Sequence, residues 1–346
     1  MLLSEKLMML PSTIKRALVI GAGSGRDIAS ATLITQELTT KGIHVDLAGF
    51  LTPWAVHLFN NHREKPINML TKNSKKYILG KENEFLDNYF EPELLNLNKE
   101  YHLKIKSFYL LSLHYGTKKL ASALQQLVKK NKYDTIIAVD MGGDILAIKK
   151  DYHEITTPIV DLTCKYLLAT LPKKIKKYLV VVAPGSDGEI NSISLAQTLK
   201  DLTKKRVVLT QENLYKLPSY PTFMMINTAL EKRTTAYSNT IHVIKKHEKK
   251  APLRTRFTRI IMHGKQRKEI YWYRTLNIHL LKHIYYLDFE RFYHYYPCHL
   301  TYHNILEALT LCRTQGFLGT EVDHTTIPSD STFKKKLFVP DLQKTL

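Results

Sequence analysis

The segment from residue 15 to 27, KRALVIGAGSGRD, constrains the fold more than any other part of the chain. Its apolar run ALVI is typical of a buried strand, three glycines follow at alternate positions, and apolar residues then recur at helical spacing from Ile28 to Leu38. A strand, a glycine turn and a helix in this order direct backbone N–H groups toward an anion such as a phosphate. We therefore expect a ligand-binding turn made by Gly21, Gly23, Ser24, Gly25, Arg26 and Asp27.

The spacing of these glycines leaves the kind of ligand open. Dinucleotide-binding folds carry G-x-G-x-x-G and an acid about 20 residues further on, whereas here the third glycine comes one position early. The nearest such acid, Asp46, is predicted to lie within the second strand. A nucleotide or another phosphorylated molecule is therefore favoured, with NAD(P) as the alternative. The alternative is that the glycines only form a tight turn between the strand and the helix and bind no ligand.

Two further predicted strands, at 135–139 and 178–183, also end in turns that combine glycine with acidic residues. The first continues into DMGGD, residues 140–144, and the second into PGSDGE, residues 184–189. The carboxyl ends of parallel strands meet at one edge of a sheet, so we expect the three turns to lie together. The candidate residues there are the acids Asp140, Asp144, Asp187 and Glu189 and the glycines Gly142, Gly143, Gly185 and Gly188.

Carboxylates at such an edge can hold Mg²⁺ against a bound phosphate or act as a general base. We assign Asp144 and Asp187 as candidate metal ligands. An Asx turn in which Asp140 caps the following helix is the structural alternative. Asp161, in the first turn of a helix predicted at 156–171, either compensates the helix dipole or points at the same edge.

Length and composition exclude several classes of protein. The chain has 346 residues, of which 44% are hydrophobic and 24% charged, as in a globular protein of one or two domains. Its apolar runs are far shorter than the ~20 residues of a membrane span, and its N-terminus lacks the basic segment of a secretory signal. Three cysteines without close spacing predict reduced thiols and a cytoplasmic location.

The net charge of +20 is concentrated away from the glycine turn, with +1 in residues 1–100, +7 in 101–200 and +12 in 201–346. The stretch 245–274 is strongly basic and includes Tyr271, Trp272 and Tyr273. Basic and aromatic residues together can bind RNA, although we favour a solvated lysine-rich surface. Nucleic acid is thus a disfavoured but open partner, and homo-oligomer formation is open as well.

Five histidines occur between residues 279 and 303. The pairs His279/His283 and His299/His303 have the i, i+4 spacing that can bind a metal on a helix. The H-E-x-x-H pattern is absent from this stretch, so we favour packing of these histidines among the neighbouring aromatic side chains.

The motifs together resemble a family known as domain of unknown function 1152. The resemblance is carried by VIGAG and its glycine turn, DMGGD (140–144), TPIVDL (157–162), PGSDGE (184–189) and GTEVDH (319–324). The last of these looks like the family's acidic C-terminal motif and adds Glu321 to the candidates. The resemblance covers residues 16 to 325 and implies a Rossmann-like α/β fold, with no activity attached. This chain departs from the family at Ser24 and Arg26, where a run of glycines is expected, and at Lys149 and Lys150.

We predict a doubly wound, Rossmann-like α/β domain with a mostly parallel sheet at residues 15–215. An α+β extension or cap, basic and rich in Tyr and His, is expected at 216–330, and a flexible tail at 331–346. The favoured function is metal-assisted phosphoryl transfer or hydrolysis on a nucleotide or phosphorylated metabolite. The alternatives are an NAD(P)-dependent oxidoreductase and a non-enzymatic protein that binds RNA, membrane or a protein partner through its basic C-terminal half. Residues 66–114 have no clear assignment.

Overall fold

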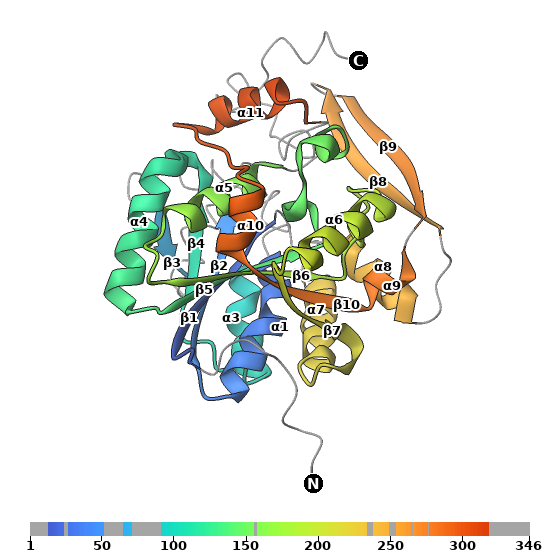
Figure 1. The fold of residues 1–346 in the computed structure, drawn as a ribbon. Helices are drawn as coiled ribbons and strands as arrows, with labels where there is room; N and C mark the ends of the chain where they lie inside the picture. The colour runs from blue at the N-terminus through green and yellow to red at the C-terminus, as the bar shows by residue number, and fades with distance from the viewer. Residues whose placement is uncertain are drawn as a thin grey trace.

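The computed structural model describes residues 13–23, 27–51, 65–70, 91–155, 158–233, 238–248, 254–263, 266–275 and 277–317. At its centre lies an eight-stranded sheet with the order β3-β4-β2-β1-β5-β6-β10-β7 (Figure 1). Its five central strands run parallel to one another: β4 (Phe108–Ser112), β2 (His44–Leu51), β1 (Arg16–Gly21), β5 (Thr135–Met141) and β6 (Lys176–Val182).

The outer strands of the sheet are added differently. At one edge β3 (Ile67–Met69) pairs antiparallel with β4. At the other, β10 (His283–Asp288) pairs antiparallel with both β6 and β7 (Val208–Asn213). From β1 the chain first builds the sheet outward through β2 and β4, then returns to β5 on the other side of β1. The predicted doubly wound, mostly parallel sheet is confirmed, and the order of its strands reverses between β1 and β5.

Helices cover both faces of this sheet and enclose two hydrophobic cores. One core lies beneath α1 (Asp27–Thr40), α3 (Glu91–Glu100), α7 (Tyr220–Arg233) and α8 (Asn239–Glu248). The other lies beneath α4 (Gly116–Asn131), α5 (Pro158–Thr170), α6 (Ser192–Lys204), α10 (Phe289–Tyr295) and α11 (Ile305–Thr314).

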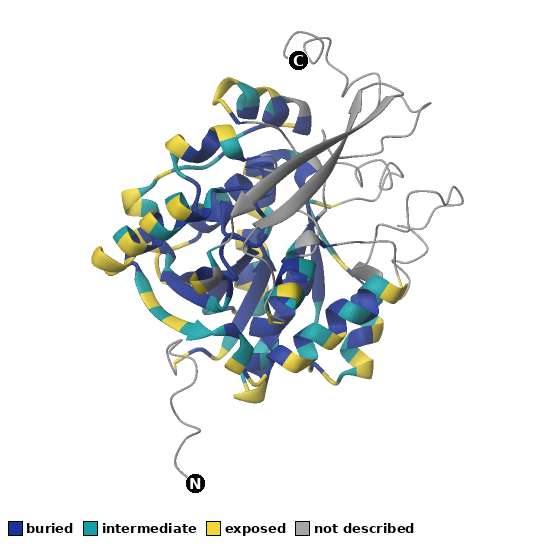
Figure 2. Cartoon of the chain, turned by 90° about the vertical axis from the view of Figure 1, so that its right-hand side faces the viewer, coloured by how far each residue is buried: buried dark blue, intermediate teal, exposed yellow. Residues whose placement is uncertain are grey.

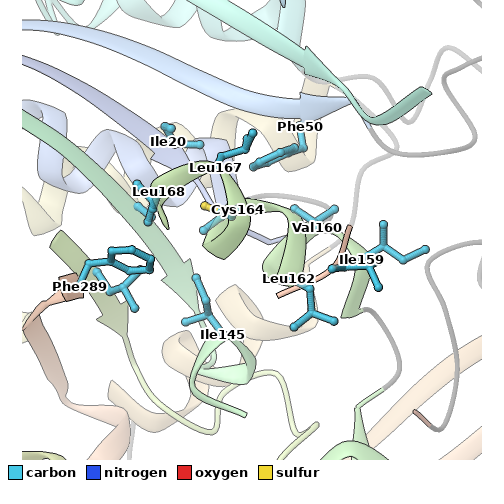
Figure 3. Close-up of a cluster of buried hydrophobic side chains, with 14 of the residues drawn as sticks. Ile20, Phe50, Ile145, Ile159, Val160, Leu162, Cys164, Leu167, Leu168 and Phe289 are labelled. Atoms are coloured by element: carbon cyan, nitrogen blue, oxygen red, sulfur yellow. The ribbon is translucent and has the colours of Figure 1, made fainter. Parts of the chain in front are cut away.

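The alternation of side chains along each strand explains why the central strands are apolar throughout. In β1, Ala17 and Val19 enter the first core, whereas Leu18 and Ile20 enter the second. Figure 2 shows the resulting buried centre of the molecule, and Figure 3 shows how α5 packs into the second core beside Ile20 and Phe50. A strand covered on both faces has no polar face to display, which accounts for runs such as ALVI.

The C-terminal part of the chain contributes to the sheet itself. β10 belongs to the segment 216–330 that we expect to form an extension or cap, yet it inserts between β6 and β7, where Ile284, Tyr286 and Leu287 are fully buried. By contrast, β8 (Arg254–His263) and β9 (Gln266–Thr275) pair only with each other, as a separate antiparallel ribbon within the basic stretch (Figure 1). None of the described helices is long and apolar enough to cross a membrane.

Candidate functional site

The turns that follow β1, β5 and β6 meet at the carboxyl edge of the sheet and are joined by hydrogen bonds. The Met141 N–H donates to Asp27 Oδ1 at 2.8 Å, which ties the start of α1 to the end of β5. The Gly185 N–H donates to the Gly142 carbonyl oxygen at 2.5 Å, which ties the turn after β6 to the turn after β5. This edge lies at the reversal of strand order, where open α/β sheets bind their ligands.

Two glycines allow these segments to approach so closely. A Cβ on Gly21 would lie 2.2 Å from the Ile28 backbone nitrogen, so only glycine lets α1 begin directly against the end of β1. Gly142 has a φ of +118°, and a Cβ there would lie 2.2 Å from Asp187 Oδ2. The absence of a side chain at Gly142 therefore gives the Asp187 carboxylate its place over the turn after β5.

Six acidic residues gather at this edge. Asp187 is half-buried, and the other five retain only 1–9% of their exposure: Asp27, Asp140, Asp144, Asp161 and Glu189. Asp140, Asp144 and Asp161 each offer a carboxylate oxygen within 4.8 Å of the others. Asp161 reaches this group from the first turn of α5, so of the two roles left open for it by the sequence, the structure places it at the carboxyl edge.

The hydrogen bonds to these acids come largely from the backbone. Asp140 Oδ2 accepts the Gly143 N–H at 2.9 Å, but Gly143 is the N-cap of the short helix that follows and no side chain caps that helix, so Asp140 does not have the capping role that was its structural alternative. Asp187 Oδ1 accepts the Glu189 N–H at 3.0 Å. Within the described ranges, no ion pair joins Asp27, Asp140 or Asp144 to a basic side chain. Burial disfavours a charged carboxylate, so a proton or a nearby cation would stabilise these acids.

The pKa values of Asp27, Asp140 and Asp144 are raised accordingly. Burial, and secondarily the charges of Asp27 and Asp187, raise the pKa of Asp140 well above its ordinary value. The pKa of Asp144 is raised by burial and then by repulsion from Asp140 and Glu189. Burial raises the pKa of Asp27 to about 8, against the opposing effect of its hydrogen bond from Met141. Without a bound cation, burial and mutual repulsion therefore favour the protonated forms of Asp27, Asp140 and Asp144.

Sequence reasoning missed one polar group at this edge. Ser186 lies in the turn after β6 and is fully buried, and its Oγ has no hydrogen-bond partner among the described residues. The sequence feature that could have identified Ser186 is its place in PGSDGE, between a glycine and an aspartate of a predicted turn. In the same turn Ala183 adopts a φ of +47°, and Gly185 and Gly188 also have positive φ. Backbone in this region is costly for alanine and is found mostly at functional turns.

The remaining predicted site residues lie at the same edge or outside the described residues. Gly23 contacts Asp27, since a Cβ there would lie 2.3 Å from Asp27 Oδ2, and Gly143 has a φ of +102°. Ser24, Gly25, Arg26 and Glu321 fall outside the described residues, as does the tail 331–346.

The histidine pairs do not have the geometry that a metal site on a helix requires. α9 (Ile278–Leu281) ends before His283, which begins β10, so the first pair does not share a helix. Neither His299 nor His303 lies in a helix. His299 Nδ1 instead lies 2.6 Å from the Tyr293 hydroxyl, and its ring packs against Tyr166. The His299 ring therefore packs among aromatic side chains, as favoured from the sequence.

Comparison with known proteins agrees with the motif resemblance. A family model described as "Protein of unknown function (DUF1152)" matches residues 64–272. No curated protein matches the chain. The matched range covers more than half of the chain, and it includes the turns after β5 and β6. The chain therefore belongs to this family, whose description assigns no activity.

Proposed function

We propose that this member of the family binds a phosphorylated small molecule, such as a nucleotide or a phosphorylated metabolite, at the carboxyl edge of its sheet. We further propose that it acts on this ligand by metal-assisted phosphoryl transfer or hydrolysis. The observation that carries the proposal is the convergence of six acids, five of them buried, at the point where the strand order reverses. No basic side chain among the described residues forms an ion pair with Asp27, Asp140 or Asp144 that would give these three acids a structural role.

The two halves of the site supply complementary chemistry. The N-terminus of α1 offers backbone N–H groups and a positive dipole to a phosphate. The carboxylates beside it would repel that phosphate if they faced it alone. A divalent cation held by these carboxylates would remove the repulsion and supply Lewis-acid polarisation of the phosphoryl group. Asp187 is the acid best suited to activate a water or hydroxyl, because it alone of the six is half-buried.

The position of Asp46 favours this proposal over an NAD(P)-dependent oxidoreductase. Asp46 is the third residue of β2, 2% exposed, and its Oδ2 accepts a hydrogen bond from the Tyr133 hydroxyl at 2.5 Å. It lies toward the amino end of the strand, away from the carboxyl edge where a dinucleotide's ribose would sit. The acid that the sequence offered for ribose binding is therefore engaged elsewhere.

Thermal unfolding with a panel of nucleotides, NAD(P) and sugar phosphates, each with and without Mg²⁺, tests the proposal. A ligand at about 100 times its Kd stabilises the protein by about 2.7 kcal/mol. We expect one class of phosphorylated ligand to raise the Tm, and Mg²⁺ to enlarge that increase. A response to NAD(P) alone, or to no ligand at all, would overturn it.

The ligand class identified in this way then allows an activity assay with matched variants. Asp187→Asn should abolish turnover and leave the far-UV spectrum unchanged. Asp201→Asn is the control, because Asp201 is also half-buried but lies near the far end of α6, where it accepts a hydrogen bond from Gln197. Full activity of Asp187→Asn would remove Asp187 from the mechanism.

A further inference from the structure

We propose that Asp140, Asp144 and Asp161 form the binding site for one divalent cation of the Mg²⁺ or Mn²⁺ type. This inference deepens the proposed function, since it names the residues that hold the cation beside the phosphorylated ligand. Asp187, which the sequence paired with Asp144, lies outside this group of three. The site can be tested with the cation alone, so the result is independent of whether the protein binds a phosphorylated ligand.

Three different elements deliver the three carboxylates. Asp140 lies near the end of β5, Asp144 begins the short 3-10 helix that follows, and Asp161 lies in the first turn of α5. Their nearest oxygens all lie within 4.8 Å of one another. Oxygens bound to Mg²⁺ at about 2.1 Å are roughly 3 Å apart when adjacent and roughly 4.2 Å when opposite. The group is therefore close to the span of one coordination shell, and a bound cation would draw it slightly inward.

A second observation sets this group apart from an ordinary acidic cluster. Asp140 is 1% exposed, and its Oδ2 accepts the Gly143 N–H. Its other oxygen, Oδ1, is buried, and no described N–H or hydroxyl group donates to it. The neighbouring Asp144 can donate a hydrogen bond only while its own carboxyl holds a proton. A buried carboxylate oxygen without a permanent donor is costly, and a cation would satisfy it.

The chemistry of the ligands indicates which cation fits. Three carboxylate oxygens form a hard, anionic ligand set, which suits Mg²⁺ or Mn²⁺ better than metals that prefer thiolate or imidazole. Three protein ligands leave other positions of an octahedral shell for water or phosphate oxygens. This arrangement matches catalytic sites in which Mg²⁺ is shared between protein and substrate.

Lys165 is the competing source of positive charge and must be tested alongside. It lies on α5 one turn beyond Asp161, is 1% exposed, and its Nζ is 5.6 Å from the centre of the Phe292 ring. If Lys165 neutralises Asp161, the Asp161→Asn substitution leaves a buried ammonium group without its partner and lowers the Tm. If the acids mainly repel one another in the cation-free protein, the same substitution raises the Tm.

The experiment is a titration of the metal-free full-length protein with Mn²⁺, Mg²⁺ and Ca²⁺, without any phosphorylated compound. Binding is followed by calorimetry, by Mn²⁺ paramagnetic resonance and by Tm. We expect one Mn²⁺ per chain and a rise in Tm with Mn²⁺ and Mg²⁺. Asp144→Asn should raise the Tm of the metal-free protein, and Asp144→Asn and Asp161→Asn should each weaken Mn²⁺ binding by at least the roughly 10- to 100-fold that loss of an outer-shell partner costs.

Asp46→Asn is the matched control, because Asp46 is equally buried in the same sheet but lies near its amino edge. This variant should retain Mn²⁺ binding of wild-type affinity. The inference is overturned if wild-type protein binds no Mn²⁺ or Mg²⁺, if both variants bind as tightly as wild type, or if Asp161→Asn lowers the Tm and leaves Mn²⁺ binding intact. Cation binding without any response to phosphorylated ligands would support the cation site and contradict the proposed function.

Discussion

The two ends of the central sheet both bury aspartate, but they surround it with different groups. Near the amino end, Asp46 Oδ2 accepts the Tyr133 hydroxyl at 2.5 Å and lies 3.3 Å from His44 Nε2. Arg16 Nη2 lies 3.3 Å from the same His44 nitrogen. At the carboxyl end, Asp140 and Asp144 face each other and Asp161, and the described donor to Asp140 is the Gly143 N–H of the backbone.

Burial alone therefore does not distinguish Asp46 from Asp140. Asp46 is 2% exposed and Asp140 is 1% exposed. What differs is the neighbourhood, since the Tyr133 hydroxyl donates a hydrogen bond to Asp46, whereas burial, and then the charges of Asp27 and Asp187, raise the pKa of Asp140. An acid that meets other acids in a low-dielectric site needs a proton or a cation from outside the fold.

The largest expected effect comes from filling the turn that carries the acidic end. Gly142→Ala forces an L residue to a φ of +118° and places a Cβ 2.2 Å from Asp187 Oδ2. We expect a loss of about 3 kcal/mol in unfolding free energy, measured by urea titration, together with a smaller ligand response. Gly42→Ala is the control, because Gly42 also has a positive φ, +76°, but nothing lies within 4 Å. It should cost only about 1 kcal/mol, and equal losses for the two variants would contradict the close contact with Asp187.

The next effect is a dependence of stability on pH that belongs to the acidic end. The pKa of Asp27 is raised from 3.8 to about 8 in the folded protein. Between these values the folded state holds a proton that the unfolded state has released, so stability falls as pH rises. For the metal-free protein we expect a loss of roughly 2 kcal/mol between about pH 6 and 8, since one such group contributes at most about 1.4 kcal/mol per pH unit.

Denaturant titrations across this pH range measure the slope. Asp27→Asn should flatten the slope, whereas Asp46→Asn should leave it unchanged. If the unfolding free energy of Asp27→Asn falls with pH as steeply as that of the wild type, the pH dependence belongs to other groups.

A smaller effect tests the amino end. Tyr133→Phe removes the hydroxyl donor from Asp46 and leaves a buried carboxylate oxygen without it, which we expect to cost about 1.5 kcal/mol. Tyr286→Phe is the matched control, because the Tyr286 hydroxyl is buried without a hydrogen-bond partner among the described residues. That variant should be neutral or slightly stabilising. Urea titration measures both, and a neutral Tyr133→Phe would mean that the hydroxyl does not stabilise Asp46.

Much of the fold follows from local patterns in the sequence. Short apolar runs bounded by glycine predicted β1, β5 and β6, and the described helices α1, α5 and α6 follow them as expected. The alternation of strands and helices predicted the parallel sheet, because parallel strands are joined by crossovers that usually contain a helix. Because parallel strands end at the same edge of a sheet, the sequence also predicted that the turns after β1, β5 and β6 lie together, without any knowledge of side-chain positions.

Other features depended on contacts between residues far apart in the chain. β10 displaces β7 from the side of β6, and the pattern of its sequence, HIYYLD, does not reveal which strands it will pair with. Likewise, α5 could present Asp161 to solvent or to the sheet edge, and the packing of its apolar residues into the core beside Ile20 and Phe50 decided the rotation (Figure 3).

The sequence by itself thus determined β1, β5, β6, the helices that follow them and the edge of the sheet where the acidic turns meet, because each depends on the period of apolar residues and on glycine at turns; it left β3, α3 and β4 unassigned. The tertiary structure decided which acids face one another. Asp46 and Asp140 both occur in strands with apolar neighbours, and only the packed sheet gives one a tyrosine hydroxyl and the other two more carboxylates. Electrostatic environment is a property of distances between distant residues, and those distances exist only in the folded chain.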